Sequence, residues 1–518
     1  MENVVTVTSP ASDNPQQKVT PPGGPDPMLG PSEANVPTER PERIPQPLWD
    51  SLSTDVRIVL AQFAEENRLL WERIRELEAR SKQNSSNSSL PGSKDRPWDK
   101  PTKRRKARGG KRGGQKGHPP RVRELLPPER VQTTHDVYPT DCKHCKCGAP
   151  PERGDEEDGS VEPHQVVDLP AITPEVAEYR LHSGVCARCG KRTRASLPAG
   201  VPAGTFGPRI QALISILAVA YHLSKRQIKS LLGDLLDIDI SVGAVVDAQA
   251  RATEALAEPV AEVHEALKQS TETAYQDETT WPEAGKKGYA WVTASGPYAY
   301  YEIAHSRSGE VARRQLDGPA YRGTVVTDRY AAYKCYPMEN RGICHSHLMR
   351  DYQKIADRGE HVKEIGESLL ELERRIFHAW HEYQDGRIDR VDLQFQLVGI
   401  AEPYQAALHR GMANDDSKVA GMCKNIHGHW EAIWNFGWVD GMEPTNNEAE
   451  RTARVLVVWR NKCQGTQSAL GSLFVSRMAT VIETCRRQAR SAYDFLVDAF
   501  AALVAGTKPP SLVVSNSS

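Results

Sequence analysis

Three acidic residues stand in sequence settings where acids are unusual. Asp277 lies within "YQDETTW", whose Tyr, Thr and Trp residues favour a strand, and Asp328 ends the strand-like "VVTD". Glu450 lies in the first or second turn of the helix that "PTNNEAER" predicts. A carboxylate at a buried strand end costs free energy unless a cation neutralises it. Brought together, the three would bind Mg²⁺ (or Mn²⁺) and support phosphoryl transfer.

The neighbouring acids are weaker candidates. Glu278 points away from Asp277 by the two-residue period of a strand. Glu448 and Glu450 diverge by roughly 200° on a helix, so only one of them faces the site. We select Glu450, with Glu448 as the fallback. The chain has 67 acidic residues, so a solvated edge or turn is the simpler explanation of Asp277 taken alone.

Five of the ten cysteines cluster in "CKHCKCG" and "CARCG". Two such knuckles can hold one tetrahedral Zn²⁺, and four thiolates leave no open position, which indicates a structural role. The predicted ligands are Cys142, Cys145, Cys186 and Cys189; an alternative pairs Cys145 with Cys147, and unligated reduced cysteines are the simplest case. Between the knuckles, "HQVVDLP" and "EVAEYRLHSG" alternate like the strands of a zinc ribbon.

A strongly basic tract precedes the cysteines. Residues 100–123 hold eleven Lys or Arg and no Asp or Glu, although the net charge of the whole chain is −1. Its Gly-rich core would let the backbone approach DNA phosphates, while a solubilising tail or a localisation signal is the alternative. The predicted DNA contacts here are Lys103, Arg104, Arg105, Lys106, Arg108, Lys111, Arg112 and Lys116.

The sequence also indicates the compartment. The N-terminus has no basic segment followed by an apolar run, and the longest apolar run, "IQALISILAVAY", is too short to span a membrane. We therefore expect a reducing interior, the bacterial cytoplasm or nucleoid, and no membrane partner.

Two helical regions frame the zinc element. Val56, Leu60, Phe63, Leu70, Ile74 and Leu77 fall at alternating steps of four and three, with Asn67 at one a-type position, which is typical of a two-stranded coiled coil. A single amphipathic helix packed on its own domain is the alternative. Further on, three helices follow residue 207, the third capped by Ser241; the last two form either a helix-turn-helix or an ordinary hairpin.

The second half of the chain predicts a mixed sheet. "ETAYQDETTW", "GYAWVTAS", "YAYYEIA" and "GTVVTD" are strand-like, a helix capped by Ser308 separates the last two, and "RGICHSH" is a candidate fifth strand. The stretch after residue 350 is helical and Trp-rich up to about residue 440. The elements that carry Asp277, Asp328 and Glu450 are thus two strands and one later helix.

The blocks "YQDETTW", "VVTDRYAAY", "CHSHLMRDY" and "NNEAERTAR" resemble those of the IS66 insertion-sequence transposases. The order of zipper-like helix, Ser/Asn linker, "GGQKGH" segment and two-knuckle element agrees, so the resemblance covers about residues 50–505. It implies an RNase H-like catalytic domain of the DDE type with a helical insertion. By motif, Asp277, Asp328 and Glu450 match the catalytic acids, and His347 and Arg350 match a C-x-x-H-x-x-R block.

The resemblance completes the expected organisation, a multidomain α+β protein. Arg350 and Arg451 join the predicted DNA contacts, with His347 in a supporting role. The expected segments are 1–48 disordered, 49–82 zipper helix, 83–130 basic flexible linker, 131–200 zinc-binding element, 201–265 helical domain, 266–355 first part of the catalytic core, 356–440 helical insertion, 441–505 second part of the core, and 506–518 disordered tail.

The implied function is a DNA transposase that cuts at the ends of its element and transfers 3′-hydroxyls to target DNA. Its partners would be double-stranded DNA, at least one further copy of the chain, and small accessory proteins. One departure stands out: "RNKCQGTQS" replaces a basic segment that usually carries an aromatic residue. A zinc-containing, non-enzymatic DNA-binding regulator and an RNase H-like nuclease acting on RNA or a hybrid are the alternatives.

Overall fold

The computed structural model describes residues 40–41, 44–81, 124–140, 142, 144, 148–149 and 161–514. The chain divides into two compact units, Met1–Gln83 and Asn84–Ser518. The eight basic residues predicted between 103 and 116, together with Cys145 and Cys147, lie outside the described residues. In the part of the chain that is described, no helix is both long and apolar enough to cross a membrane.

The described part of the first unit contains two consecutive helices, α1 (Gln46–Ser51) and α2 (Thr54–Ser81). Apolar residues of the predicted seam, such as Phe63 and Leu70, are 63% and 60% exposed. Asn67 uses its amide to donate to the carbonyl of Phe63 at 3.0 Å. The long helix is therefore present with its apolar stripe facing solvent, and the coiled coil stays a prediction.

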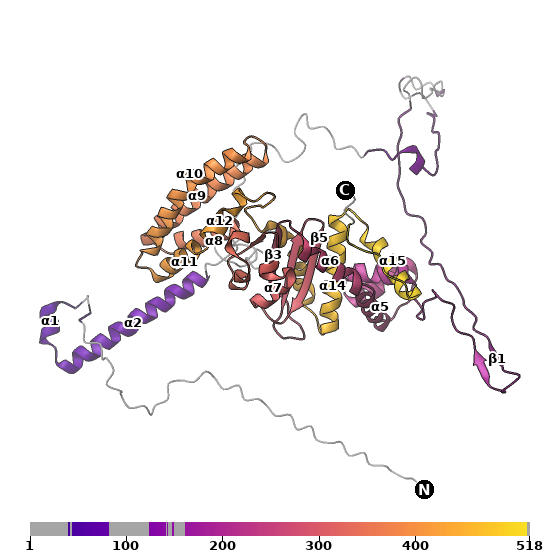
Figure 1. Cartoon of the computed structure of the whole chain (residues 1–518), viewed down its shortest axis with the longest axis horizontal. Helices are drawn as coiled ribbons and strands as arrows, with labels where there is room; N and C mark the ends of the chain where they lie inside the picture. The colour runs from indigo at the N-terminus through magenta and orange to yellow at the C-terminus, as the bar shows by residue number, and fades with distance from the viewer. Residues whose placement is uncertain are drawn as a thin grey trace, which may run out of the picture. The chain divides into compact units, whose positions relative to one another are not determined.

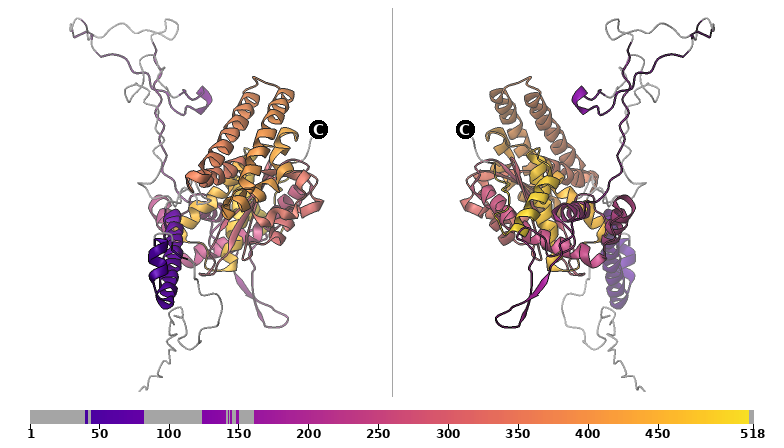
Figure 2. Two further views of the ribbon diagram at one scale, coloured as in Figure 1. Left: turned by 90° about the vertical axis from the view of Figure 1, so that its left-hand side faces the viewer. Right: turned by 90° about the vertical axis from the view of Figure 1, so that its right-hand side faces the viewer.

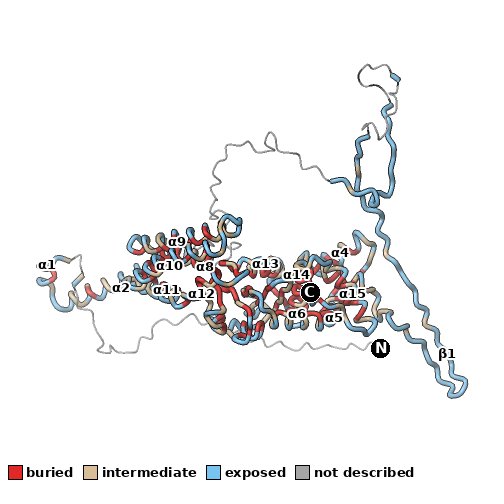
Figure 3. Tube along the Cα trace, turned by 45° about the horizontal axis from the view of Figure 1, so that its top comes forward, coloured by how far each residue is buried: buried red, intermediate tan, exposed pale blue. Residues whose placement is uncertain are grey.

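The segment predicted as a zinc ribbon is extended and exposed over residues 161–200 (Figure 3). Only a short antiparallel hairpin forms, from β1 (Ser183–Val185) and β2 (Arg192–Arg194) around the second knuckle. The strands predicted in "HQVVDLP" and "EVAEYRLHSG" do not form between residues 161 and 182, where apolar residues such as Val166 and Leu169 face solvent and pair with no strand among the described residues. The alternation was a misleading signal here.

A five-stranded mixed sheet forms the centre of the second unit (Figure 1). Its strand order is β5-β4-β3-β6-β7; the first three strands pair antiparallel, and β6 and β7 run parallel to β3. All five predicted strands are present, so the predicted α+β mixture is confirmed. Their bounds are β3 (Ala274–Thr280), β4 (Tyr289–Ser295), β5 (Tyr298–Ala304), β6 (Val325–Thr327) and β7 (Arg341–Ile343).

Helices from both ends of the unit cover this sheet. α13 (Asn447–Cys463) packs against β3 and β4, and α14 (Ala469–Arg487) lies along β5. The hydroxyl of Thr480 accepts from the backbone N–H of Tyr301 at 3.1 Å, and Thr484 bonds both backbone groups of Ala299. These contacts satisfy the outer edge of β5, which would otherwise be open to another strand.

The helices predicted after residue 207 pack on the C-terminal helices. α3 (Pro208–Val219) and α5 (Val242–Ala255) contact α14 and α15 (Ala492–Ala505), while α4 (Lys225–Leu236) lies between α3 and α5 in sequence and contacts both. Ser241 caps α5 as predicted, accepting from the N–H of Ala244 at 3.0 Å. The helix-turn-helix function of α4 and α5 stays a prediction.

The remaining elements connect these layers. α6 (Ala257–Gln269) precedes the sheet and α7 (Gly309–Leu316) separates β5 from β6; Ser308 stands at its N-cap position, but its side chain makes no capping bond. The short 3₁₀ helices are Pro128–Arg130, Gly318–Ala320, Ala331–Cys335, Met338–Asn340 and Asn435–Gly437.

A helical insertion follows β7. Figure 2 shows its two longest helices, α9 and α10, as an antiparallel pair that projects from the sheet. The bounds are α8 (His345–Ala356), α9 (Glu360–Gln384), α10 (Arg390–Met412), α11 (Ser417–His427) and α12 (Trp430–Trp434).

A buried pair, His345 and Glu373, links the first residue of α8 to α9 within the insertion. His345 Nδ1 lies 2.9 Å from Glu373 Oε2, and Nε2 lies 2.9 Å from the carbonyl oxygen of Ile433. Although burial opposes it, the charge and hydrogen bond of Glu373 raise the pKa of His345, which favours a ring that donates from both nitrogens. Tyr404 donates to the other oxygen of Glu373 at 2.7 Å. The whole group is fully buried.

The predicted disordered tail needs a partial correction. Leu512 is fully buried, and its carbonyl accepts from the side chain of Gln488 at 2.8 Å. Lys508 pairs with Glu262 of α6 at 3.2 Å. These contacts hold residues 507–514 against the helices, so this part of the predicted disordered tail is ordered. Residues 515–518 lie outside the described residues.

Candidate active site

Asp277 lies in β3, and Asp328 directly follows the neighbouring parallel strand β6. Ala274 of β3 pairs with Val325 of β6, and Tyr275 pairs with Val326. Continuing this register by two residues brings Asp277 level with Asp328, on strands about 4.8 Å apart. Each carboxylate also accepts one backbone hydrogen bond, Asp277 from Glu278 at 2.9 Å and Asp328 from Tyr330 at 2.8 Å.

The carboxylates repel one another. Burial raises the pKa of Asp277 well above its usual value, and the charges of Glu278, Asp328 and Glu450 raise it further. Asp277 therefore stands in a field of negative charge that a divalent cation would relieve.

Asn446 places Glu450 by tying the start of α13 to the sheet. Its side-chain amide donates to the carbonyl of Gln276 at 2.7 Å, and its backbone N–H donates to Cys344 Sγ at 3.2 Å. Both contacts are buried. One turn further along α13, the side chain of Glu450 lies beside His347 and Arg350 of α8.

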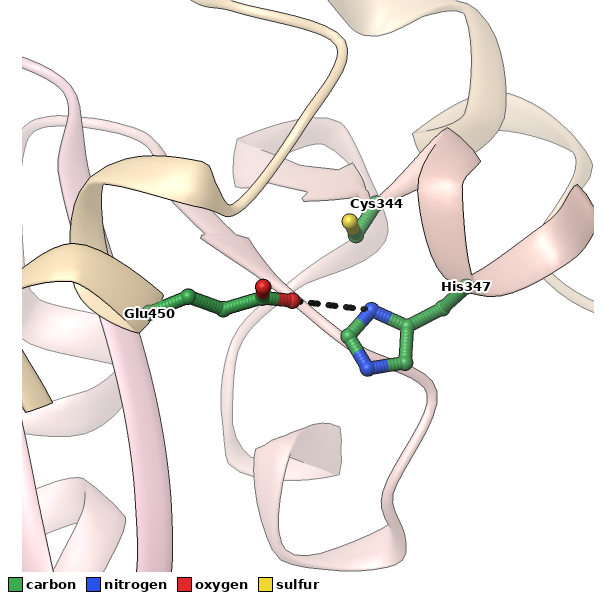
Figure 4. Close-up of side chains that lie close together, drawn as sticks. All are labelled: Cys344, His347 and Glu450. Atoms are coloured by element: carbon green, nitrogen blue, oxygen red, sulfur yellow. Dashed lines mark ion pairs between the residues drawn. The ribbon is translucent and has the colours of Figure 1, made fainter. Parts of the chain in front are cut away.

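Glu450 is held by two residues of α8. Its Oε1 lies 3.3 Å from Arg350 Nη2 and 3.8 Å from His347 Nδ1 (Figure 4). Glu448, the fallback candidate, instead pairs with Arg451 and Arg487. Burial raises the pKa of Glu448 less than these two arginines lower it. The two acids therefore have different partners, since Glu450 contacts α8 whereas Glu448 contacts Arg451 and Arg487.

A thiol joins this group. The donor atoms of Cys344, His347 and Glu450 all lie within 4.8 Å of one another (Figure 4). Burial raises the pKa of the Cys344 thiol to about 11. Burial and the nearby Arg350 lower the pKa of His347. Cys344 was not among the predicted site residues, although its C-x-x-H spacing with His347 is one that metal ligands use.

Glu278 belongs to a separate polar cluster. Arg307 donates from Nε to its carboxylate at 2.9 Å, and the hydroxyl of Tyr333 donates to the other oxygen. Burial, followed by the charge of Asp328, raises the pKa of Glu278 to about 7. Its two partners make Glu278 a support for the loop after Asp328, consistent with its assignment away from the metal site.

The two predicted DNA-contacting arginines of this region are both in ion pairs. Arg350 is one-quarter exposed and contacts Glu450, while Arg451 is exposed and contacts Glu448. Arg350 is therefore the one that lies beside the candidate metal ligands.

The predicted zinc ligands are only partly described. Cys186 and Cys189 lie in the turn between β1 and β2, where Gly190 adopts the positive φ of +65° that such a turn favours. Backbone N–H groups of Cys189 and Arg188 lower the pKa of the Cys186 thiol. Cys142 lies in the first knuckle, where its N–H donates to the carbonyl of Ala149 at 3.1 Å. The four-cysteine site stays a prediction.

The unusual "RNKCQGTQS" segment packs on the end of β3. Arg460 donates to the hydroxyl of Thr279 at 2.7 Å, and Trp281 donates to the hydroxyl of Thr466 at 3.1 Å. Gly465 has φ +91°. The ring of Trp281 is fully buried against Trp459, with centroids 5.1 Å apart. The segment therefore braces the strand that carries Asp277.

Comparison with known proteins decides the family. The family described as "Transposase IS66 family" matches residues 203–472, more than half of the chain. The chain belongs to the IS66 transposase family. The matched range contains both aspartates, the whole helical insertion and Glu450, and it confirms the resemblance found in the sequence.

Two further matches to known sequences were found for this transposase. Residues 30–124 match "Family of unknown function (DUF6444)". "Uncharacterized protein y4hP" of Sinorhizobium fredii (strain NBRC 101917 / NGR234) is 27% identical over 329 residues, which is 55% of this chain and 57% of that protein. The chain thus spans just over half the length of this curated relative.

Proposed function

We propose that this transposase cuts DNA at the ends of its element and joins the freed 3′-hydroxyls to target DNA, with Mg²⁺ or Mn²⁺ held by Asp277, Asp328 and Glu450. The observation that carries the proposal is the register of β3 and β6, which makes the two aspartates neighbours. Membership of a transposase family supports the nuclease and transferase chemistry in general.

The residues suit such an ion. Carboxylate oxygens are the ligands that Mg²⁺ prefers, and the raised pKa of Asp277 reflects crowded negative charge that a cation would neutralise. When bound, the metal would polarise the attacking oxygen and stabilise the leaving oxygen of the phosphodiester.

The protein's own contribution is positional. Asp277 and Asp328 are fixed on strands, whereas Glu450 must leave Arg350 and His347 to turn toward them. That movement would free the guanidinium of Arg350, which could then pair with a DNA phosphate. The same arginine would therefore neutralise Glu450 in the free protein and position the substrate in the complex.

The fold supports the DDE assignment. Three antiparallel strands followed by two parallel ones, with the third acid on a later helix, are the arrangement expected of an RNase H-like domain. We assign α8–α12 as its helical insertion.

DNA binding would extend beyond this domain. The basic tract would supply affinity that falls with salt, and the zinc element with α4 and α5 would help to recognise the ends. Joining two ends requires at least two copies, for which α2 offers a zipper. We propose that the reaction takes place in the bacterial cytoplasm or nucleoid, with small accessory proteins of the element as further partners.

The test is Mg²⁺-dependent cleavage of DNA that carries the element's ends. We expect Asp277→Asn and Glu450→Gln to reduce cleavage on the order of 10³-fold, since the metal contributes several kcal/mol to the transition state. Glu448→Gln is the matched control on the same helix and should retain cleavage. If Glu448→Gln loses cleavage and Glu450→Gln retains it, Glu448 rather than Glu450 is the third metal ligand.

The alternatives make different predictions. A non-enzymatic regulator, which the family does not favour, would bind the ends without cutting them, and Asp277→Asn would leave its function unchanged. An RNase H-like nuclease acting on RNA would give no joined product from DNA with free 3′-hydroxyl ends, so a strand-transfer assay separates it from the transposase.

A further inference from the structure

The cluster of Cys344, His347 and Glu450 carries a second inference, because its ligand types differ from those of the aspartates. Mg²⁺ is a hard ion that takes oxygen ligands, whereas a thiol and an imidazole favour Zn²⁺ and similar softer ions. Cys sulfur, His nitrogen and Glu oxygen are each ligands that Zn²⁺ takes in proteins, and three protein ligands leave a fourth position open.

The geometry is close to that of a bound ion. With Zn–S near 2.3 Å and Zn–N near 2.0–2.1 Å, donor atoms around a tetrahedral zinc lie about 3.3–3.6 Å apart. Here His347 Nδ1 and Glu450 Oε1 are 3.8 Å apart, and all three donors lie within 4.8 Å of one another. Closing the site requires movements of about 1 Å, within the reach of side-chain rotation.

Two of the three ligands are already fixed. Cys344 is fully buried at the N-cap of α8, and its sulfur accepts from the backbone N–H of Asn446. His347 follows three residues later on the first turn of α8, and its Nδ1 is buried without a hydrogen-bond partner. A buried ring nitrogen without a partner costs free energy, and a metal ion at this position would satisfy it.

We propose that Cys344, His347 and Glu450 form a binding site for Zn²⁺ or a similar thiophilic divalent ion, and that this ion inhibits the enzyme by holding Glu450 on α8. On binding, the sulfur loses its proton to the solvent and becomes a thiolate ligand. Glu450 cannot serve this ion and the Asp277–Asp328 pair at the same time. The inhibition rests on the proposed function, whereas the binding itself does not.

Binding is tested on the full-length protein with Co²⁺ as a spectroscopic substitute for Zn²⁺. We expect Cys344→Ser to lower the bound metal by one equivalent per chain and to remove the matching share of the sulfur-to-cobalt absorption. Because the variant is compared with the wild type, any metal that the N-terminal cysteines bind is the same in both proteins and does not affect the difference. Cys423→Ser, another buried cysteine, is the matched control and should retain all of the metal.

A second variant protects the test against misfolding. His347→Gln keeps the thiol but removes the nitrogen ligand, and we expect at least tenfold weaker Zn²⁺ binding in competition with a chromophoric chelator. Thermal unfolding checks that each variant folds. Unchanged stoichiometry and affinity in folded Cys344→Ser and His347→Gln would refute the site.

The inhibitory role is tested by adding Zn²⁺ to the Mg²⁺-dependent cleavage reaction. Each protein is compared with its own rate without Zn²⁺, and we expect Cys344→Ser to need at least tenfold more Zn²⁺ for half inhibition. Equal sensitivity would overturn the inhibitory role. If the wild type never cleaves DNA, the proposed function and the inhibition both fail, while the cobalt result still decides the metal site.

Discussion

Replacing Asp277 with Asn should stabilise the metal-free protein while it abolishes cleavage. Asp277 lies level with Asp328 and is repelled by it, by Glu278 and by Glu450. Two charges about 6 Å apart repel by about 3 kcal/mol at an effective dielectric of about 20. Because Asp277 can relieve part of this by binding a proton, the expected gain is about 1–3 kcal/mol. For a body of about 300 residues, that is a rise in melting temperature of about 2–5 °C.

The pH dependence has a definite sign. A carboxyl whose pKa is raised by folding stabilises the protein at low pH and loses that contribution as the pH rises through the folded value. The advantage of Asp277→Asn should therefore grow from acidic to neutral pH. Asn cannot replace the charge that attracts Mg²⁺, so the ion should raise the melting temperature of the wild type more than that of the variant.

The assay is thermal unfolding in EDTA and in Mg²⁺, at acidic and neutral pH. Asp239→Asn is the control, since Asp239 is exposed and pairs only with Lys229. It should keep both the wild-type melting temperature and the response to Mg²⁺. Two results would refute this reasoning: a melting temperature of Asp277→Asn below that of the wild type in EDTA, or a wild-type melting temperature that Mg²⁺ does not raise.

Three further outcomes follow from the packing. Glu373→Gln should destabilise the protein by about 3–5 kcal/mol, because it strands the buried imidazolium of His345, and urea unfolding measures the loss. Burial would raise the pKa of Asp416, but hydrogen bonds from Arg358 and backbone N–H groups outweigh it and lower the pKa to about 2. Asp416 should therefore stabilise the fold above about pH 4 and lose that effect toward pH 2. Asp416→Asn should flatten the acid limb of a curve of unfolding free energy against pH. Gly465→Ala should cost about 1–3 kcal/mol, since φ is +91° and a Cβ would meet a backbone carbonyl; a melting temperature equal to the wild type's would contradict this.

The sheet was predictable because its signals are local. Alternating and β-branched residues marked β3, β4 and β5, and Asp328 ended its strand as expected. The same signal failed between residues 161 and 182, since alternation indicates a strand only where another strand can pair with it. Local sequence could not supply that partner.

The composition of the site was less predictable. Helical phase separated Glu448 from Glu450, but one of the two arginines that pair with Glu448, Arg487, comes from another helix, α14. Likewise, the proximity of Cys344 to Glu450 depends on Asn446 bridging α13 to α8. Contacts between residues a hundred positions apart follow from packing, which a single sequence does not reveal.

The position of α13 also has a consequence during synthesis. The strands with Asp277 and Asp328 leave the ribosome long before Glu450, which follows the entire helical insertion. At about 5–20 residues per second, the 450 − 328 = 122 positions between Asp328 and Glu450 take roughly 6–24 s. During that interval the nascent chain has an aspartate pair but no third acid. A chain that stalls or is truncated inside the insertion therefore lacks Glu450, so under the proposed mechanism a partly made transposase would not cut the DNA near which it is being translated.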